Sequence, residues 1–457
     1  MPDRLPRLRI PRRLAQRWRA RLRAQRRWWR ERWRATGGAD VLFPPVGHGM
    51  VAVETLTGGA GDDATPAPAA PGPRIAILHA TAGGGHKQAA KAIATAVAGM
   101  DPGAQVREVD TLVFASQLYR RTYVQTYNAM AARAPRLWGL LYRSSESARV
   151  NRGTAPLRLG LDRVNLRRLV SVVERESPDA VVCTHFLPVE ALSPVRGRGR
   201  LRVPLYCVIT DFTAHPFWAF PHVDRYFVAS DGVAAELAGH GVDRARIEVT
   251  GIPIEPRFAH RIGREAACRR FGLDPARPVV AVLGGGTGVG PLGTLAERLT
   301  RLASAPQIVV ACGTNARLHS QIEALPAARS GQILALGFTH EMDAVLEACD
   351  VAVSKAGGLT CAEALTKHTP LVFFLPMPGQ EVANAAFLEA GGAAVRAGSV
   401  DEVGARVEAW IADPAARERA RAAAERLARP RAAETVARRV LEGAATFDGR
   451  APLDRSA

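Results

Sequence analysis

The sequence predicts an α/β protein with two doubly wound parallel sheets. Short apolar strands alternate with helical segments from Arg74 onward, and glycine-rich turns directly follow several of these strands. The alternation breaks at residues 251–254 and starts again near Pro278, which indicates a second sheet. Folds of this class bind ligands at such turns, because glycine lets backbone N–H groups approach closely and the helix dipole favours negative charge.

Composition sets broad limits on the class of protein. The length of 457 residues suits roughly two or three domains, and an apolar fraction of 47% is ordinary for a globular protein. Six widely spaced cysteines without a CxxC pair indicate neither a disulfide framework nor a zinc site, and they favour a reducing cytoplasm. No apolar run approaches the ~20 residues that a membrane-spanning helix needs, and the N-terminus lacks the apolar core of a secretory signal.

The net charge of +18 is concentrated at the N-terminus. Residues 1–35 contain fourteen arginines and two acidic residues, and so carry twelve of these net charges. As a helix, residues 12–35 would gather Leu and Trp on one face, which is typical of a helix lying in a membrane interface. A solvated basic tail and an arginine-rich nucleic-acid arm are the alternatives. Because of the tryptophans, we expect this segment to bind an anionic membrane surface rather than nucleic acid.

Changes in composition divide the chain into five parts. Proline, glycine and alanine dominate after the arm and mark a linker, and the two α/β patterns follow it. We expect an amphipathic arm at 1–35, a linker at 36–73, an N-terminal domain at 74–256, a second domain at 257–430, and a C-terminal helix and tail at 431–457.

The first glycine turn lies between an expected strand at residues 75–78 and a helix expected from about Lys87. Its GGGH spacing at residues 83–86 matches neither a Walker A loop nor the usual dinucleotide fingerprint. The distinguishing residue is His86, which titrates near neutral pH and stands at the mouth of the turn.

Polar residues also end two later strands of the first domain. The expected strand at 180–183 ends in the pair TH, and the one at 205–209 ends in TD, followed by TAHPFW. The carboxyl ends of parallel strands meet at one edge, so we expect a shared cleft containing His86, His185, Asp211 and His215. Packing is the plainer interpretation of the two later histidines, and Asp211 suits either orienting His86 or capping a helix.

Residues 112–143 predict an amphipathic helix that is unusually rich in aromatic side chains. A core-facing stripe and an apolar flap that touches lipid are both consistent with this pattern.

The second half of the chain has two glycine turns of its own. GGGTGVG at 284–290 and KAGG at 355–358 each follow an expected strand, and they suit a diphosphate held by backbone N–H groups. Two domains across a cleft, each with a glycine turn, suit a transfer between two substrates. No DxD pair is placed to hold a metal ion, so we expect metal-independent chemistry without a cofactor, with Lys355 and helix N-termini stabilising the leaving diphosphate.

Taken in order, these motifs resemble one known family over roughly residues 74–425. The chain resembles glycosyltransferase family 28, in the group of monogalactosyldiacylglycerol synthases and processive diacylglycerol glucosyltransferases. The matching stretches are TAGGGHKQAAKAI (81–93), YVQTYNAMAARAPRLWGLLY (123–142), SPDAVVCTHFLP (177–188), VITDFTAHPFW (208–218), GIPIEPRF (251–258), LGGGTGVG (283–290), CGTNARL (312–318), GFTHEMDAVLEACDVAVSKAGGLTCAEAL (337–365) and PGQEVANAAFL (378–388).

The resemblance implies the GT-B fold of two Rossmann-like domains facing across a cleft. The first domain would bind the lipid acceptor and the second a UDP-sugar. His86 would be the general base on the acceptor hydroxyl, with Asp211 beside it, and direct displacement would invert the α-linkage of the donor. The resemblance does not cover the arginine-rich arm.

The same resemblance and the glycine turns assign the binding residues. On the acceptor side we expect Gly84, Gly85, His185, His215 and Trp218. On the donor side, the expected glycine-loop residues are Gly285, Gly286, Gly288, Gly313 and Asn315, and the expected uracil contacts are Gly337, Phe338 and Met342. Lys355, Gly357, Gly358 and Thr360 would cradle the diphosphate, Glu363 would hold the ribose, and Gln380, Glu381 and Asn384 would hold the sugar hydroxyls.

Two positions depart from the family pattern. Ala356 stands where the family commonly has proline before the glycine pair, and Phe186 stands where it often has proline after His185. The first departure bears on the phosphate turn and the second on an acceptor contact.

The sequence thus predicts an inverting hexosyltransferase that forms a β-glycolipid on diacylglycerol at the inner face of the cell membrane. UDP-glucose and UDP-galactose are both consistent as donors. The alternatives are an N-acetylglucosamine transferase acting on a lipid-linked cell-wall precursor, a UDP-sugar epimerase, and a non-enzymatic protein led by the basic arm. The aromatic segment and the THFLP stretch favour the diacylglycerol group.

Overall fold

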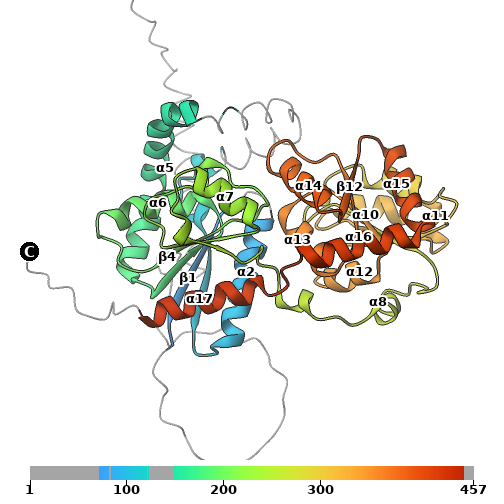
Figure 1. The fold of residues 1–457 in the computed structure, drawn as a ribbon, viewed down its shortest axis with the longest axis horizontal. Helices are drawn as coiled ribbons and strands as arrows, with labels where there is room; N and C mark the ends of the chain where they lie inside the picture. The colour runs from blue at the N-terminus through green and yellow to red at the C-terminus, as the bar shows by residue number, and fades with distance from the viewer. Residues whose placement is uncertain (1–71, 82–83, 121, 123–143, 145–147, 447–457) are drawn as a thin grey trace, which may run out of the picture. The chain divides into compact units, whose positions relative to one another are not determined.

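The computed structural model describes residues 72–81, 84–120, 122, 144 and 148–446 (Figure 1). The arginine-rich arm, almost all of the linker and most of the aromatic segment fall outside these ranges, so what the sequence predicts for them stays a prediction. Both sheets of the fold belong to one compact unit, Thr57–Ala457.

The first sheet has six parallel strands in the order β2-β1-β3-β4-β5-β6. This order places β1 and β3 side by side at the centre, so the turns that follow them meet at one edge. The strands are β1 (Arg74–His79), β2 (Gln105–Asp110), β3 (Ala180–Cys183), β4 (Leu205–Val208), β5 (Arg225–Val228) and β6 (Ile247–Val249).

The helices around this sheet differ from the expected pattern at three points. The helix expected over residues 112–143 does not begin at residue 112, because residues 111–114 form the short 3-10 helix η1 and the backbone at Ala115 is extended. Helix α2 begins at Gly85 rather than near Lys87, which puts His86 in its first turn. Helix α6 is not among the elements expected from the sequence; it contains Pro188 and Pro194, and Pro188 lies in the first turn, where no intrahelical N–H bond is lost. The elements are α2 (Gly85–Met100), η1 (Thr111–Phe114), α5 (Ala148–Glu176), α6 (Phe186–Gly197), η2 (Pro216–Trp218), α7 (Asp231–Gly239), η3 (Arg244–Arg246) and η4 (Pro256–Ala259).

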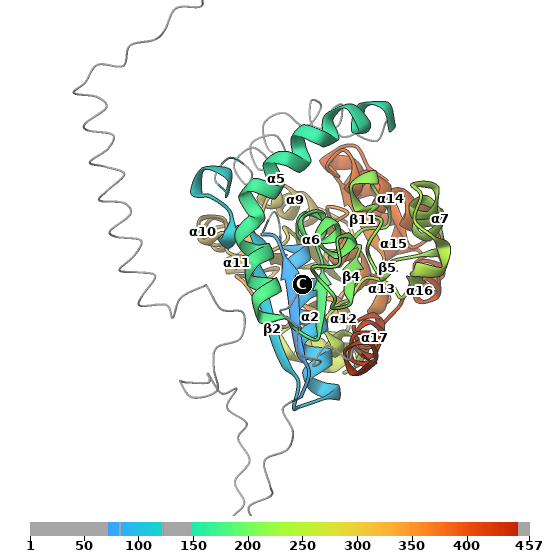
Figure 2. The same cartoon turned by 90° about the vertical axis from the view of Figure 1, so that its left-hand side faces the viewer.

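Helices α5 and α6 pack against each other, and Figure 2 shows the long helix α5 from the side.

The second sheet also has six parallel strands, in the order β12-β11-β10-β7-β8-β9. Its strands are β7 (Val279–Leu283), β8 (Gln307–Ala311), β9 (Ile333–Leu336), β10 (Val351–Ser354), β11 (Leu371–Phe374) and β12 (Ala394–Ala397). Its helices are α8 (Arg264–Arg270), α9 (Leu292–Leu299), α10 (Ala316–Glu323), α11 (Pro326–Arg329), α12 (Met342–Ala348), α13 (Gly358–Thr366), α14 (Gln380–Ala390), α15 (Val400–Ala412) and α16 (Pro414–Leu427).

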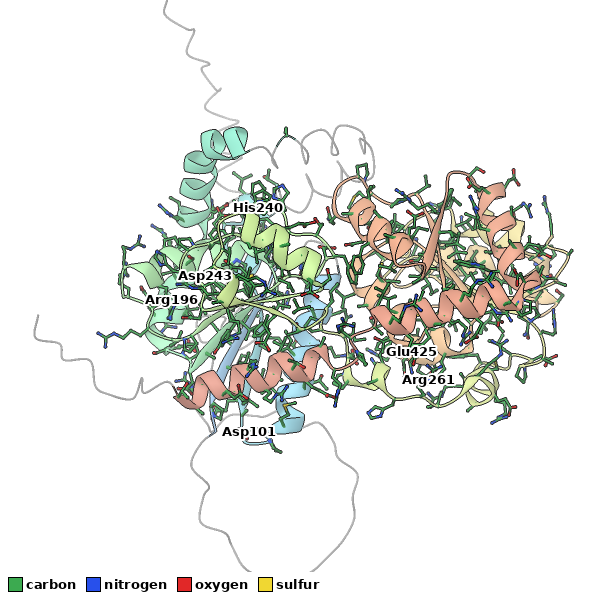
Figure 3. All side chains as sticks on the ribbon, viewed as in Figure 1. Asp101, Arg196, His240, Asp243, Arg261 and Glu425 are labelled. Atoms are coloured by element: carbon green, nitrogen blue, oxygen red, sulfur yellow. The ribbon has the colours of Figure 1, made fainter. Side chains whose placement is uncertain are left out.

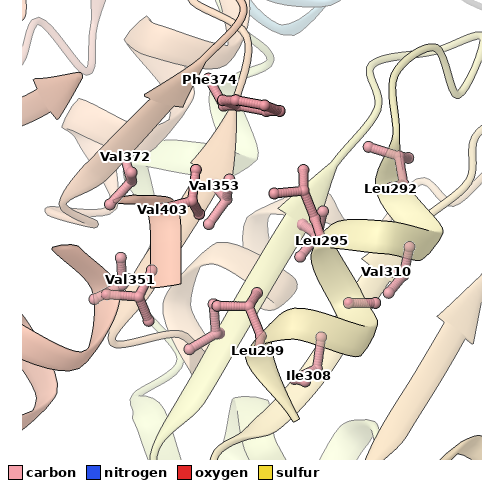
Figure 4. Close-up of a cluster of buried hydrophobic side chains, with 14 of the residues drawn as sticks. Leu292, Leu295, Leu299, Ile308, Val310, Val351, Val353, Val372, Phe374 and Val403 are labelled. Atoms are coloured by element: carbon pink, nitrogen blue, oxygen red, sulfur yellow. The ribbon is translucent and has the colours of Figure 1, made fainter. Parts of the chain in front are cut away.

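Valine and isoleucine from the central strands form the core of the second sheet together with leucines of α9 (Figure 4). Leu292, Leu295 and Leu299 recur at helical spacing, so one face of α9 covers the sheet. The expected apolar strands are confirmed here because each is buried on both faces, as parallel strands require.

The last helix, α17 (Ala432–Thr446), returns to the first sheet. Ala433, Val436 and Val440 are buried in the same cluster as Ile75 and Ile77 of β1, and Figure 1 shows α17 beside α2. The C-terminal helix therefore completes the core of the first sheet, although it follows the second sheet in the sequence.

A buried ion pair fixes the crossover segment after β6. The Lys367 ammonium lies 2.7 Å from Glu347 Oε2, and it also donates to the carbonyl oxygen of His260 on the crossover. Glu347 Oε1 accepts from the Gly263 N–H at 2.8 Å, and Arg261, labelled in Figure 3, lies 3.8 Å from the same oxygen. The crossover is thus attached to α12 and α13 rather than free in solvent.

All six cysteines are buried and unpaired, as expected. Among the helices of the described ranges, none has the length and apolar character needed to cross a bilayer.

Candidate active site

His86 lies at the edge where the first sheet's strands end. Its Nδ1 atom is 2.7 Å from the carbonyl oxygen of Thr184 and 3.0 Å from Thr210 Oγ1. The Thr184 hydroxyl donates in turn to the His86 carbonyl oxygen at 2.9 Å. The ring is therefore held by the residues that directly follow β3 and β4, together with the first turn of α2.

These contacts assign the tautomer of His86. A carbonyl oxygen can only accept a hydrogen bond, so Nδ1 carries the proton and Nε2 keeps its lone pair. Burial lowers the pKa of His86 to about 4, against the smaller opposing effect of the bond to Thr184. The imidazole is therefore neutral at pH 7, and Nε2 can accept a proton from a substrate hydroxyl.

Aromatic rings line one side of His86. The His185 ring lies 4.6 Å from it in an edge-to-face arrangement, and the Trp218 ring lies 6.3 Å away. Phe186 extends this wall, with its ring 4.4 Å from His185 and 5.9 Å from Trp218, and Phe217 lies 5.8 Å beyond Phe186. These rings give the site an apolar surface on one side of the imidazole.

His185 and His215 both begin short helices. His185 Nδ1 accepts from the Leu187 N–H, and His215 Nδ1 accepts from the Phe217 N–H, each at 3.1 Å. Burial, together with repulsion from His86 and His79, holds the pKa of His185 well below its ordinary value. The structure thus brings His185 and Trp218 beside His86, whereas His215 contacts the site through Phe217 at 4.3 Å.

The two expected acceptor glycines differ in their surroundings. A Cβ atom added at Gly84 would meet nothing within 4 Å, whereas one at Gly85 would lie 3.3 Å from the Leu359 side chain of α13. The open side of the turn is therefore at Gly84.

Thr184 and Thr210 occupy the orienting position that the sequence considered for Asp211. Asp211 Oδ1 instead accepts a hydrogen bond from Asn384 Nδ2 at 2.9 Å. Burial raises the pKa of Asp211, and the bond from Asn384 opposes this shift. Asp211 is thereby tied to α14 of the second sheet.

Asn384 is fully buried, although the sequence predicts it as a sugar contact. Its Nδ2 donates to the Ala356 carbonyl oxygen at 2.9 Å as well as to Asp211, and its Oδ1 accepts from the Phe212 N–H at 2.7 Å. Both amide protons are therefore already in use.

The glycine loop after β7 packs against the loop after β8. A Cβ atom at Gly288 would come within 2.1 Å of the Cys312 carbonyl oxygen, and one at Gly313 within 2.5 Å of the Gly286 carbonyl oxygen. Asn315 caps α10 and donates to the Gly288 carbonyl oxygen at 3.2 Å. Close packing of the two loops thus requires glycine at positions 288 and 313. Gly285 lies beside them in the loop after β7.

The turn from Lys355 to Gly357 leads from β10 into α13. Within the described residues, no side chain caps this helix, so its first N–H groups are available to an anion. A Cβ atom at Gly357 would meet nothing within 4 Å, whereas one at Gly358 would lie 2.0 Å from the Thr210 carbonyl oxygen. Thr360 lies half-buried in the same helical turn.

Glu363, one turn further along α13, lies among charged groups from the crossover segment and α12. Burial and the Glu255 carboxylate raise its pKa to about 8, with a smaller contribution from Asp343, and Arg257 opposes this shift. A neutral carboxyl at pH 7 can both donate and accept hydrogen bonds, as a pair of ribose hydroxyls requires.

Phe338 follows β9 and exposes 51% of its surface, with its ring 5.2 Å from that of His340 in an edge-to-face arrangement. Gly337 precedes it, and Met342 begins α12. An exposed aromatic face at a strand end offers a surface on which a base can stack.

At the start of α14, two polar side chains differ in how well they are satisfied. Glu381 Oε2 accepts from the Met377 N–H at 2.7 Å, and its pKa is raised by burial, with the Met377 bond and Lys355 opposing. Gln380 Oε1 is buried and has no hydrogen-bond partner among the described residues. Such an acceptor is costly to leave unpaired, so it marks a place where a ligand hydroxyl would be stabilised.

The sequence reasoning passed over three groups that the structure brings to the site. Thr184 and Thr210 are the first residues of the TH and TD pairs, of which the sequence favoured the second. Arg257 belongs to the GIPIEPRF stretch, where it pairs with Glu255 and lies 3.9 Å from Asp343. The strand-end rule pointed to the threonines but does not say which member of a pair faces inward.

Comparison with known proteins identifies two family domains in the chain. Residues 86–254 match the model for monogalactosyldiacylglycerol (MGDG) synthase, and residues 279–435 match the glycosyltransferase family 28 C-terminal domain. The first match covers strands β2 to β6 of the first sheet, and the second covers all six strands of the second sheet.

The chain is also similar to curated proteins described as processive diacylglycerol beta-glucosyltransferases. The chain is 34% identical over 230 residues to a processive diacylglycerol beta-glucosyltransferase of Bacillus pumilus, covering 50% of this chain and 59% of that protein. It is 31% identical over 278 residues to a protein of the same name from Bacillus thuringiensis, covering 60% of this chain and 71% of the relative. The match to the first of these thus spans less than two thirds of the relative's length.

Among solved structures, MurG of Acinetobacter baumannii has a similar fold. The TM-score is 0.54 at 17% sequence identity, over 81% of this chain and 99% of that one. At this identity the likeness concerns the fold alone, and it supports a GT-B-like arrangement of the two sheets.

Proposed function

Because this chain belongs to glycosyltransferase family 28, in the group of monogalactosyldiacylglycerol synthases and processive diacylglycerol glucosyltransferases, we propose that it transfers a hexose from a UDP-sugar to diacylglycerol. The observation that carries the proposal is the fixed tautomer of His86, which leaves Nε2 of a neutral imidazole without a proton.

In this reaction His86 is the general base. Nε2 removes the proton from the lipid hydroxyl while the hydroxyl oxygen attacks the anomeric carbon, and the bond from that carbon to the diphosphate breaks. Thr184 accepts from Nδ1–H and stabilises the imidazolium that forms, which offsets part of the cost of burying that charge. A direct displacement inverts an α-linked donor to a β-glycolipid.

On the donor side, the uncapped N-terminus of α13 receives the diphosphate. Its backbone N–H groups and the Lys355 ammonium stabilise the charge that develops on the leaving group. Glu363 then lies one turn along α13 for the ribose, and Phe338 offers its exposed face to the uracil. This arrangement supplies the positive field without a metal ion, so we expect a chelator to leave the rate unchanged.

For the transferred sugar we assign Gln380 and Glu381. The support is the unpaired buried Gln380 Oε1, together with the strained backbone at Leu375 (φ 50°), which leads into this turn. Glucose and galactose differ at one hydroxyl, and either would satisfy this acceptor.

We further propose that the enzyme works at a membrane surface, where its acceptor is dissolved. Three exposed apolar side chains, Val113 of η1, Leu118 and Val164 of α5, belong to segments that pack together, because η1 contacts α5, and we call them the α5 patch. The packing there includes a bond of 2.7 Å from Ser116 Oγ to Asn165 Oδ1. Exposed Arg163 and Arg167 flank Val164 on α5, which suits anionic lipid.

The arginine-rich segment 12–35 would add a second, independent attachment to the membrane. Two weak attachments together bind far more tightly than either alone, because the second is made at high local concentration.

The decisive test is product identification. The full-length protein is incubated with diacylglycerol-containing vesicles and labelled UDP-glucose, UDP-galactose or UDP-N-acetylglucosamine, and the lipid product is identified with its anomeric linkage. We expect a β-hexosyl diacylglycerol. Transfer only from UDP-N-acetylglucosamine to a lipid-linked cell-wall precursor would instead support the N-acetylglucosamine transferase. Formation of an epimerised nucleotide sugar without a lipid product would support the epimerase.

A further inference from the structure

The segment Thr210–Phe212, just after β4, joins the two halves of the site. Thr210 Oγ1 lies 3.0 Å from His86 Nδ1, and the Thr210 carbonyl oxygen packs so closely on Gly358 that an added Cβ would lie 2.0 Å away. One residue thus contacts both the base and the first residue of the helix expected to hold the diphosphate.

Asn384 is the side chain that holds this segment in place. It accepts from the Phe212 N–H at 2.7 Å and donates to Asp211 Oδ1 and to the Ala356 carbonyl oxygen, each at 2.9 Å. One buried amide therefore connects the end of β4 to the turn that precedes α13. The Phe212 ring is also stacked on Phe387 of α14, with centroids 4.6 Å apart and planes inclined by 18°.

These bonds leave Asn384 no proton for a sugar hydroxyl. To bind one, it would have to release Asp211 or Ala356, and leaving a buried acceptor unpaired is costly. Gln380 lies one turn earlier in α14 and can still accept a hydrogen bond, since its buried Oε1 has no partner among the described residues. The two amides of this helix are therefore suited to different tasks.

We propose that Asn384 is a positioning residue rather than a sugar contact: by tying Thr210–Phe212 to the turn before α13, it fixes His86 relative to the donor. The inference rests on the proposed function for what is being positioned. A change of about 1 Å in such an alignment lowers a rate by up to about a hundredfold without any loss of binding.

The test is the Asn384→Ala variant of the full-length protein, measured for turnover and for binding of UDP and of the UDP-sugar by calorimetry. We expect kcat to fall at least about tenfold. The ratio of the affinity for UDP to the affinity for the UDP-sugar should stay that of the wild type. The acid limb of the rate profile should also move upward in pH, because a loosened Thr210 admits water to His86. A selective loss of UDP-sugar affinity, with UDP affinity kept, would identify Asn384 as a sugar contact and overturn the proposal.

Two further variants separate positioning from general destabilisation. Phe387→Ala removes the ring that stacks on Phe212, so it should loosen the same segment and lower kcat by a smaller factor. This variant replaces Asn384→Ala in the test if Asn384→Ala does not fold. Leu388→Ala removes a buried side chain of the same helix that makes no hydrogen bond to the segment, so it should lower the melting temperature but leave the acid limb in place. An equal shift of the acid limb in Leu388→Ala would count against the proposal.

Hydrogen exchange tests the same bridge without any reaction. In Asn384→Ala, exchange of the Phe212 amide should accelerate far more than in Leu388→Ala, because its acceptor is gone. If the wild type makes no glycolipid but this exchange effect is found, the proposed function fails while the bridge stands. If exchange at Phe212 is unchanged, the bridge itself is refuted.

Discussion

The Nδ1 atom of His86 lies 2.7 Å from the carbonyl oxygen of Thr184, and this single contact decides which ring nitrogen can act as a base. The acceptor is a backbone atom at the end of β3, so it cannot be lost by a change of side chain at Thr184. The neutral ring therefore keeps the lone pair of Nε2, which gives the first two predictions.

Replacing His86 with alanine should nearly abolish transfer. A positioned general base contributes about a hundredfold to ten-thousandfold, and no other described side chain shares its contacts with Thr184 and Thr210. Binding of UDP, measured by calorimetry, should be unchanged because the donor groups lie on the second sheet. The exposed His222 gives a matched control, since His222→Ala should retain full activity. Full turnover in His86→Ala would remove the base assignment.

Activity should persist into mildly acidic solution and fall as pH drops through about 4. Burial lowers the pKa of His86 from 6.5 to about 4, so Nε2 stays unprotonated well below the ordinary titration range of histidine. The folded protein should also lose stability as the solution becomes acidic. In the unfolded state His86 takes up its proton as pH falls below 6.5, so its contribution to stability, present above 6.5, is lost as pH falls to about 4. Initial rates should be taken only where circular dichroism shows the folded protein; an acid limb near 6.5 would contradict the buried base.

Gly357, the N-cap of α13, and Gly358, its first residue, should respond very differently to an added methyl group. In Gly358→Ala the new Cβ would stand 2.0 Å from the Thr210 carbonyl oxygen, so the backbone must shift, and we expect a loss of about 1–3 kcal/mol in unfolding free energy. In Gly357→Ala the Cβ meets nothing within 4 Å, and φ of −68° suits alanine, so stability should be nearly unchanged. Denaturant unfolding of both variants checks this, and equal midpoints would contradict the close approach.

The Lys367–Glu347 pair should matter far more when broken than when replaced. Burial favours a neutral Glu347, but hydrogen bonds from Lys367 and the Gly263 N–H outweigh it and hold the pKa of this carboxyl below its usual value. Lys367→Met leaves a buried carboxylate unpaired and should cost about 3–5 kcal/mol in unfolding free energy. The double variant Lys367→Met/Glu347→Leu should recover most of that loss in denaturant unfolding; a double variant as unstable as the single one would show that the charges themselves are needed.

Membrane attachment should depend on both the α5 patch and the arm. Leu118, 78% exposed, is the most exposed member of the patch, so Leu118→Asp should weaken sedimentation with anionic vesicles severalfold. Deleting residues 1–35 should weaken it further and make it less sensitive to salt. Ile262, 44% exposed on the crossover segment, gives the control, since Ile262→Asp should bind as the wild type does. Unchanged vesicle binding after deletion of the arm, with RNA binding lost, would favour the nucleic-acid interpretation.

Most of the fold could be predicted from local pattern. Buried parallel strands such as β7 and β10 are continuous apolar runs, and such runs are visible in a single sequence. Helix α6 was not among the elements expected from the sequence, and the packing of the surrounding sheet overrides the local signal of its two prolines. The return of α17 to the first sheet could not be predicted, because an amphipathic helix does not say which core it completes.

The location of the candidate site could be proposed from the sequence, but its hydrogen bonds could not. Strand ends and glycine turns pointed to His86 and the α13 turn, and the family resemblance pointed to the start of α14. Which residue of each strand-end pair faces His86 depends on strand register and backbone direction, so Thr184 and Thr210 were passed over for their neighbours. Similarly, the sequence grouped Asn384 with Gln380. In the structure both amide protons of Asn384 are used in hydrogen bonds, whereas the buried Gln380 Oε1 has no partner among the described residues.

By itself the sequence determined the two-sheet α/β class and the family, and it pointed to His86 as the candidate base, since these follow from hydrophobic period and short motifs. The tertiary structure alone decided the proton's place on His86, the bond between Asn384 and the segment after β4, and the exposed α5 patch. The reason is physical: a residue's type and spacing are local properties, whereas a hydrogen-bond partner, a depressed pKa and an exposed surface exist only once distant segments have packed together.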